Sequence, residues 1–330
     1  GAGAGQSCLA VSLGGCAASA LSFAALVLLY RTAVPAGPRR RPPYVRVLRI
    51  ALPFGLANTL RSGLNSLENL IIPRRLALFA GTAQAMADYG VVRGMAFPVL
   101  MFPAAILFSL AELLVPELSR CAAGRRHRRI SYLARRSLRL ALLFGLCCGG
   151  LIFSLADALG ELLYHHAGAG NCLRLYAPFL PLLYTDIVTD AICKGLGQQN
   201  ANARYNIFTS LLDVTVLWIL LPRLGMGGYY FSFLLTHLVN FLLSLRCLML
   251  VTQVRPTAGM PLRAVLSTAA AVWITGLFPV QATVTGVLLS AATYLLLLGF
   301  LWILFCVVSR SSFSWLFGLI RSSFSPRCKC

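Results

Sequence analysis

The chain has 330 residues, of which 58% are hydrophobic and 12% charged, and its mean hydropathy is +0.78. Soluble domains carry about 25% charged residues, so this composition excludes an ordinary soluble domain and indicates a polytopic membrane protein. The net charge is +20, but the basic residues lie in short segments between apolar runs. That pattern is typical of membrane topology rather than of a nucleic-acid-binding surface, and we predict no nucleic-acid partner.

Nine apolar stretches come close to the length of about 20 residues that a helix needs to cross a bilayer. They predict an all-α fold with about nine transmembrane helices, at residues 8–30, 48–72, 91–115, 138–156, 173–193, 207–221, 229–250, 265–280 and 284–308. Prolines inside these stretches, such as Pro103, are tolerated where neighbouring helices satisfy the freed backbone groups. Gly145 and Gly149 form a GxxxG pattern, for which we predict a packing contact rather than a dimer face.

The stretch at residues 48–72 carries polar residues that recur at the spacing of one helix face. The candidate cavity-lining residues on this helix are Asn58, Arg61, Ser62, Asn65, Glu68 and Asn69. An ionisable side chain at the bilayer centre costs about 2.5–3.5 kcal/mol on insertion scales, so we expect these side chains to face protein or a water-filled cavity. The alternative is a network of Arg61, Asn65 and Glu68 that only joins neighbouring helices.

Later helices repeat the pattern. Asp186, Asp190 and Lys194 are spaced at i, i+4 and i+8, so Asp190 and Lys194 can pair, whereas Asp186 lies deeper without an obvious local partner. Two further polar stripes follow: Asn206, Thr209, Ser210 and Asp213, and then Thr236, His237, Asn240 and Ser244. We predict a helix bundle around a hydrated central cavity, as a transporter for a polar substrate requires. Asp186, Asp190 and Asp213 are candidates for ion coupling.

Motifs for catalysis or metal binding are weak. The 11 cysteines are scattered, with no CxxC pair and no Cys/His metal spacing. The segment KGLGQQ lacks the Walker pattern, and no nucleophile–base pair stands out. We therefore predict a protein that is not an enzyme, with no metal site and no cofactor.

The basic residues also predict an orientation. If the first helix runs inward, alternation places 23 of the 29 Lys and Arg residues in the cytoplasm, and this asymmetry decides the topology. We expect a multi-pass cell-membrane protein with a cytoplasmic C-terminus. Residues 309–330 combine aromatic and basic side chains, which is typical of an amphipathic tail lying on the inner leaflet.

Three segments resemble a known family: ALPFGLANTLRSGLNSLENLIIPRRL, YGVVRGMAFPVLMFPAAILFSLAELLVPELSR, and LPLLYTDIVTDAICKGLGQQNANARYNI with the later LPRLGMGGY. They are similar to the stage V sporulation protein B family of polysaccharide-biosynthesis proteins of Gram-positive bacteria. This family belongs to the multidrug/oligosaccharidyl-lipid/polysaccharide exporter superfamily. The resemblance runs from about residue 48 to residue 250 and rests mainly on hydropathy elsewhere.

The resemblance implies a MATE-like fold of two six-helix lobes around a cavity, sometimes with two extra C-terminal helices. The chain would then divide into the last helix of the first lobe (1–30), a basic cytoplasmic linker (31–47), the second lobe (48–252), two additional helices (253–308) and a cytoplasmic tail (309–330). Five helices of the first lobe are absent from this sequence. Because alternating access requires both lobes, we predict that these 330 residues alone do not transport.

The function that the resemblance implies is translocation of a lipid-linked oligosaccharide or peptidoglycan precursor across the cytoplasmic membrane. The partners are then that precursor and membrane lipids, with a coupling cation as a further candidate. Arg61 could bind a pyrophosphate or sugar-acid oxygen as a fork, the asparagines could bind sugar or peptide groups, and Glu68 could hold Arg61 or a cation. Two alternatives stay open: a MATE-type drug/cation antiporter, and a non-transporting scaffold in cell-wall or spore-cortex synthesis.

Overall fold

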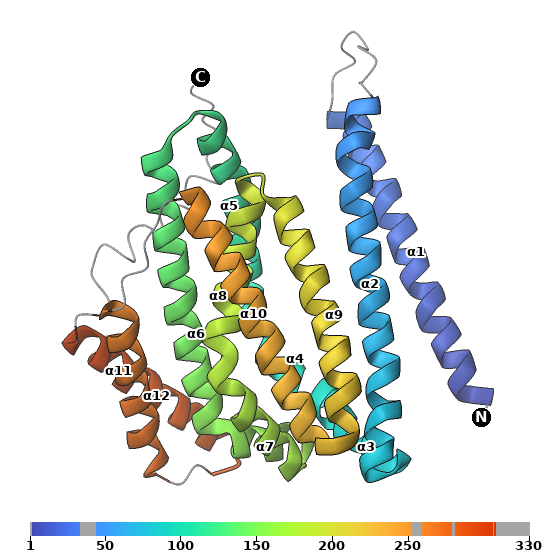
Figure 1. Ribbon diagram of the computed structural model, residues 1–330. Helices are drawn as coiled ribbons and strands as arrows, with labels where there is room; N and C mark the ends of the chain where they lie inside the picture. Colours follow the sequence, from blue (N-terminus) through green and yellow to red (C-terminus); the bar gives the residue numbers. More distant parts are fainter. Residues whose placement is uncertain (1, 34–43, 253–258, 279–280, 306, 308–330) are drawn as a thin grey trace. The chain divides into compact units, whose positions relative to one another are not determined.

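The computed structural model describes residues 2–33, 44–252, 259–278, 281–305 and 307, and every regular element in these ranges is helical (Figure 1). In chain order the elements are α1 (Ala2–Ala33), α2 (Tyr44–Ala80), α3 (Thr82–Gly90), η1 (Val91–Ala96), α4 (Phe97–Met101), α5 (Ala104–Ala123), α6 (His127–Tyr164), α7 (Ala167–Tyr176), η2 (Ala177–Phe179), α8 (Leu180–Gly195), α9 (Gln199–Leu224), α10 (Met226–Thr252), α11 (Gly259–Gly276) and α12 (Val284–Leu304). The predicted all-α fold is confirmed. The predicted tail at 309–330 and most of the predicted linker lie outside the described residues.

The contacts within the chain separate two units. The first, Gly1–Ala51, contains α1 and the first part of α2. The second, Leu52–Cys330, begins inside α2 and contains all the other elements. The site considered below lies entirely within the second unit. The finer division of the chain into a linker, a six-helix lobe and two additional helices stays a prediction.

The protein is a polytopic membrane protein. In the described ranges, α6, α9, α10 and α12 are long and apolar enough to cross a bilayer, and the bent segment from α3 to α5 adds a fifth span if it is counted as one. Large apolar side chains face outward: Phe102, Leu296 and Ile303 are 81%, 75% and 72% exposed. Such a surface is stable in lipid and would aggregate in water. The predicted number of nine spans stays a prediction.

Two stretches predicted as continuous helices are broken. The helix axis bends by 58° between Thr82–Met101 and Ala104–Ala123. The bend lies at Pro103, which has no backbone N–H to donate to the preceding turn and whose ring crowds that turn. The predicted helix at 173–193 likewise divides into α7, the short 3₁₀ segment η2 and α8, where Pro178 and Pro181 interrupt the hydrogen bonds.

The centre of the second unit is α8, which packs against α5, α6 and α10 (Figure 1). Two glycines let α6 approach α8 and the preceding segment η2 closely. A Cβ atom on Gly145 would lie 2.6 Å from the Cα of Pro181, and one on Gly149 would lie 2.7 Å from the carbonyl oxygen of Ala177. The predicted role of the GxxxG pattern as a packing contact is confirmed. On another side of α6, α11 and α12 pack against each other and against α6.

A single arginine ties α2 to α9. Pro222, inside α9, has no N–H, so the carbonyl of Trp218 one turn earlier loses its helical donor. Arg75 replaces that donor: its Nη2 and Nε lie 2.8 and 3.2 Å from the Trp218 carbonyl oxygen. The guanidinium also lies over the Trp218 indole, 4.0 Å from the ring centroid. Through this contact α2 holds the end of α9, where Pro222 leaves a carbonyl without its helical donor.

We expect Arg75→Ala to destabilise the protein by roughly 2 kcal/mol, because it removes a charge-assisted hydrogen bond and leaves a backbone carbonyl without a donor. The measurement is the thermal unfolding midpoint of the purified chain in detergent. Arg74→Ala is the matched control, since Arg74 is exposed and makes no hydrogen bond or ion pair to the described residues. Equal shifts in the two variants would contradict this role for Arg75.

Candidate functional site

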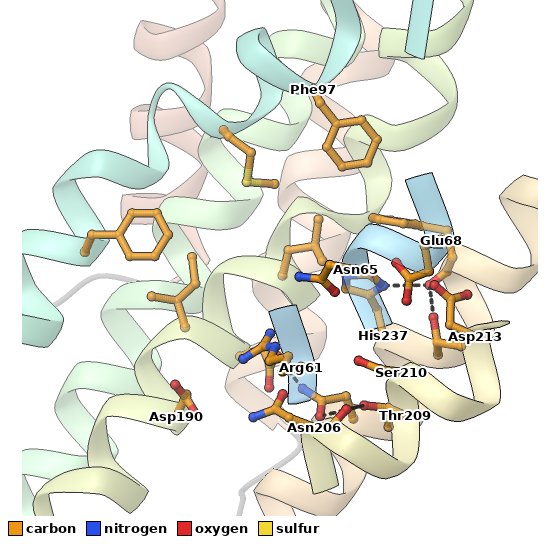
Figure 2. Close-up of a pocket in the computed structure, with 18 of the residues that line it drawn as sticks. Arg61, Asn65, Glu68, Phe97, Asp190, Asn206, Thr209, Ser210, Asp213 and His237 are labelled. Carbon is orange, nitrogen blue, oxygen red and sulfur yellow. Dashed lines mark hydrogen bonds between the residues drawn. The ribbon is translucent and has the colours of Figure 1, made fainter. Parts of the chain in front are cut away.

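The second unit contains an open cavity of about 1000 Å³, lined by residues of α2, α3, η1, α4, α5, α8, α9 and α10 (Figure 2). Seven of the predicted site residues line it: Arg61, Asn65, Glu68, Asn69, Asp186, Asp190 and Asp213. The polar stripes predicted on separate helices therefore converge on one space. Ser62 is exposed and is not among the lining residues. The side chain of Asn58 lies outside the described residues.

Local helix geometry places the α2 residues in the cavity. Arg61, Asn65 and Glu68 are three or four positions apart, so they lie on one face of α2. Leu64 and Ile72 are spaced on the same face of α2; both are buried, and Ile72 also lines the cavity. This face of α2 therefore carries apolar as well as polar residues.

Arg61 presents a free guanidinium to the cavity. The described residues provide it with neither a hydrogen bond nor an ion pair, although its charge acts on Glu68 and Asp186. Hydrogen bonds joining Arg61, Asn65 and Glu68 to one another are also absent from the described residues. The alternative in which these three side chains only join neighbouring helices stays open.

Two carboxyl groups from different helices form one side of the cavity. Glu68 is only 9% exposed, and the charges nearest to it are those of Asp213, Arg93 and Arg61. Ser232 on α10 donates a hydrogen bond of 2.5 Å to Asp213 Oδ1. Figure 2 shows Glu68 and Asp213 close together, with His237 beside them. A pair of carboxylates in such surroundings favours a bound cation or a shared proton.

Arg93 is a cavity residue that the polar stripes did not reveal. It donates from Nη2 to Asn69 Oδ1 at 3.3 Å and from Nε to the Tyr89 oxygen at 3.2 Å, and the Tyr89 hydroxyl donates to Asn69 Oδ1 at 2.9 Å. These contacts join α2 to α3 and η1. The available signal was an arginine near the start of an apolar stretch, four residues after a tyrosine.

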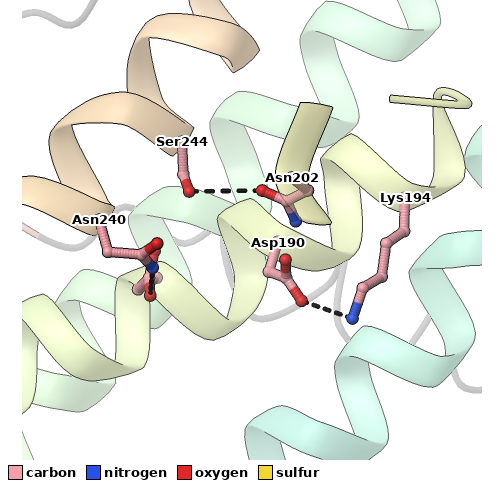
Figure 3. A network of polar contacts seen from close by, with 6 residues as sticks. Asp190, Lys194, Asn202, Asn240 and Ser244 are labelled. Atoms are coloured by element: carbon pink, nitrogen blue, oxygen red, sulfur yellow. Dashed lines mark hydrogen bonds and ion pairs between the residues drawn. The ribbon is translucent and has the colours of Figure 1, made fainter. Parts of the chain in front are cut away.

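A second polar network lies on α8, α9 and α10 (Figure 3). The predicted pair of Asp190 and Lys194 is confirmed, with Nζ 2.5 Å from Oδ2. Asp186 finds its partner on another helix, where Asn240 Nδ2 donates to Asp186 Oδ2 at 2.9 Å. The cavity lining as a whole contains five carboxylates and three permanently basic groups. In the described part of the chain, no group of three or more His, Cys, Asp or Glu side chains is arranged to hold a metal ion.

Comparison with known proteins identifies a matching family model and two curated relatives. The family model for the lipid II flippase MurJ matches residues 5–176, a little over half of the chain. Stage V sporulation protein B of Bacillus subtilis (strain 168) is 27% identical over 161 residues, which are 48% of this chain and 31% of that protein. Sporulation protein YkvU of the same organism is 24% identical over 177 residues, which are 53% of this chain and 40% of that protein. No solved structure matches.

The chain spans less than half the length of these curated relatives. The matched residues nevertheless include α2 and η1, the elements that carry Asn69 and Arg93, and also α5 and α6. The resemblance seen in the sequence is confirmed by the family model and by both sporulation proteins. This membrane-embedded helical bundle with its polar cavity belongs to the lipid II flippase MurJ family.

Proposed function

We propose that this chain forms part of a flippase that carries a lipid-linked oligosaccharide or peptidoglycan precursor across the cytoplasmic membrane by alternating access. The observation that carries the proposal is the convergence of polar side chains from several helices on a cavity of about 1000 Å³ within an apolar bundle. A sugar–phosphate head group cannot cross the hydrocarbon core unaided, and a cavity of this kind provides polar contacts along its path. The matching family is described as that of a lipid II flippase, and this description supports the proposal, as does the similarity to stage V sporulation protein B.

In this proposal Arg61 binds the phosphate or sugar-acid oxygens of the head group. A guanidinium offers two parallel donors to such oxygens, and Arg61 has them free in the described residues. Asn65 and Asn69 hydrogen-bond the sugar or peptide groups. The lipid tail stays along the apolar outer surface while only the head group enters the cavity.

We also propose that a cation couples transport to an ion gradient. The cavity lining has more carboxylates than basic groups, so a bound cation or proton balances its charge. Asp190 is already paired with Lys194 and Asp186 with Asn240, whereas Asp213 faces Glu68. Among the three predicted coupling residues, this arrangement favours Asp213, with Glu68 as its partner.

The proposed location is the cell membrane of a Gram-positive bacterium, with the C-terminus in the cytoplasm. The excess of Lys and Arg on one side of the predicted spans supports this orientation. The two matching sporulation proteins of Bacillus subtilis support the Gram-positive assignment.

The direct test is reconstitution of the full-length gene product in liposomes that contain a fluorescent lipid-linked disaccharide. We expect protein-dependent movement of the labelled head group between leaflets, detected by its accessibility to a membrane-impermeant quencher. Uptake of an organic cation without movement of the lipid would instead support the antiporter. Absence of both activities, in protein that restores growth to a mutant strain, would support the scaffold.

A further inference from the structure

The helices around the cavity line it with side chains of different chemistry. Those from α4 and α5 are apolar with the exception of Glu112, and they are Phe97, Met101, Phe108, Ala111 and Val115. Those from α2 and α9 are polar with the exception of Ile72. Figure 2 shows Phe97 apart from the group formed by Arg61, Asn206 and Thr209. A ligand in this cavity therefore meets an apolar wall as well as a hydrogen-bonding wall.

Helix periodicity produces the apolar wall. Phe108, Ala111 and Val115 are spaced at i, i+3 and i+7, so they lie on one face of α5, and all three line the cavity. Leu107 and Leu114, on a neighbouring face, are buried in the core. Phe108 is 53% exposed. Part of its ring surface is therefore open to a ligand in the cavity.

Phe97 is held in place at the same wall. Its ring makes edge contacts with Tyr176 and Phe233, at centroid distances of 5.3 and 5.5 Å. The guanidinium of Arg93 lies 5.7 Å from the centroid of the ring. Phe97 is nevertheless only half-buried and lines the cavity. A ring that is already fixed loses little conformational freedom when a ligand packs on it, which favours binding.

The polar wall offers neutral hydrogen-bonding groups that are not used within the chain. Asn65, Asn206 and Ser210 line the cavity, and their side chains make no hydrogen bond to the described residues. Apolar surface in a hydrated cavity costs free energy that is recovered when a ligand covers it. Apolar walls with a few well-placed polar groups are typical of small-molecule sites. A purely ionic group would use only the polar wall, so the cavity fits a ligand with one apolar and one polar side.

We propose that Phe97, Met101 and Phe108 form an apolar platform that binds the C–H face of a sugar ring. A pyranose ring carries C–H groups on its faces and hydroxyl groups along its edge. It can therefore pack on the platform while its hydroxyls hydrogen-bond the free amide and hydroxyl groups of α2 and α9. This inference rests on the proposed function, and it adds that the cavity recognises a sugar of the head group by packing as well as by hydrogen bonds.

The test is binding of two fluorescent lipids to the full-length gene product in detergent, measured by anisotropy. One is a lipid-linked disaccharide, and the other is the same lipid pyrophosphate without a sugar. We expect Phe108→Ala to weaken binding of the disaccharide lipid about fivefold, the size of one aromatic packing contact, and to leave binding of the sugar-free lipid unchanged. Phe108→Tyr keeps the ring and should restore binding. The sugar-free lipid also reports whether each variant is folded.

Phe102→Ala is the matched control, because it removes the same ring from a position that is 81% exposed and outside the cavity lining. It should bind the disaccharide lipid as the parent protein does. Unchanged binding in Phe108→Ala, while the parent protein binds the disaccharide lipid, would overturn the platform and leave the proposed function standing. Equal losses for the two lipids, or equal losses in Phe102→Ala and Phe108→Ala, would also overturn it.

Two further outcomes concern the ligand itself. Failure of the parent protein to bind the disaccharide lipid would overturn both the platform and the proposed function. An organic cation whose binding is weakened by Phe108→Ala, while binding of the disaccharide lipid is not, would assign the apolar wall to the antiporter and overturn the sugar site.

Discussion

Replacing Arg61 by alanine in the full-length gene product is expected to abolish complementation of a flippase-deficient strain. Arg61 is the cavity arginine whose guanidinium has no hydrogen bond to the described residues, so its donors are available to a ligand. Loss of charge-assisted hydrogen bonds to a bound head group costs roughly 1.5–3 kcal/mol, which is enough to weaken head-group binding about tenfold or more. Growth of the strain at the restrictive condition is the measurement.

Three further variants are needed to interpret the result for Arg61→Ala. Arg74→Ala removes a charge from the same helix at an exposed position outside the cavity lining, and it should support normal growth. Arg61→Lys keeps the positive charge but loses the two parallel N–H donors of the guanidinium, so it should support growth only partly. Normal growth with Arg61→Ala would remove this residue from the mechanism. Normal growth after Arg61 and Glu68 are neutralised together would favour the scaffold instead.

The second prediction with a large expected effect concerns Gly145, where α6 packs closely against α8. We expect Gly145→Ala to destabilise the protein, because the new Cβ would lie 2.6 Å from Pro181 Cα and 3.2 Å from the Leu180 carbonyl oxygen. Both contacts are with backbone atoms that cannot rotate away, so α6 and α8 must separate. Overpacking of this kind costs about 1–3 kcal/mol. The thermal unfolding midpoint in detergent should fall accordingly.

Gly299→Ala is the matched control for this prediction. It makes the same change inside α12, where nothing lies within 4 Å of the position of the new Cβ. Helix propensity alone favours alanine over glycine by about 1 kcal/mol, so this variant should be neutral or slightly more stable. The two substitutions therefore have opposite expected signs. A stabilising effect of Gly145→Ala would show that the close approach of α6 and α8 is not required.

Much of the candidate site was predictable from local spacing. Arg61, Asn65 and Glu68 share a helix face because they are three or four residues apart, and all three line the cavity. Asp190 and Lys194 form the predicted pair for the same reason. In each case the partners lie on one helix, where the backbone repeat determines which side chains are neighbours.

Contacts between helices were not predictable in this way. Asp186 pairs with Asn240, a residue 54 positions later on another helix. Arg93 joins the cavity because η1 turns it toward Asn69, 24 positions earlier. A proline inside a helix predicts a bend, as found at Pro103, but the angle of that bend depends on the helices packed around it.

The sequence by itself determined that this is a helical membrane protein and which face of each helix is polar. The physical reason is that lipid cannot satisfy a charge or a free backbone group, so hydropathy and helical period record where water or protein must lie. Only the tertiary structure decided that these polar faces meet in one cavity. Which faces meet depends on close contacts such as that at Gly145 and on bends such as that at Pro103, where the position of one helix is set by others far away in the sequence.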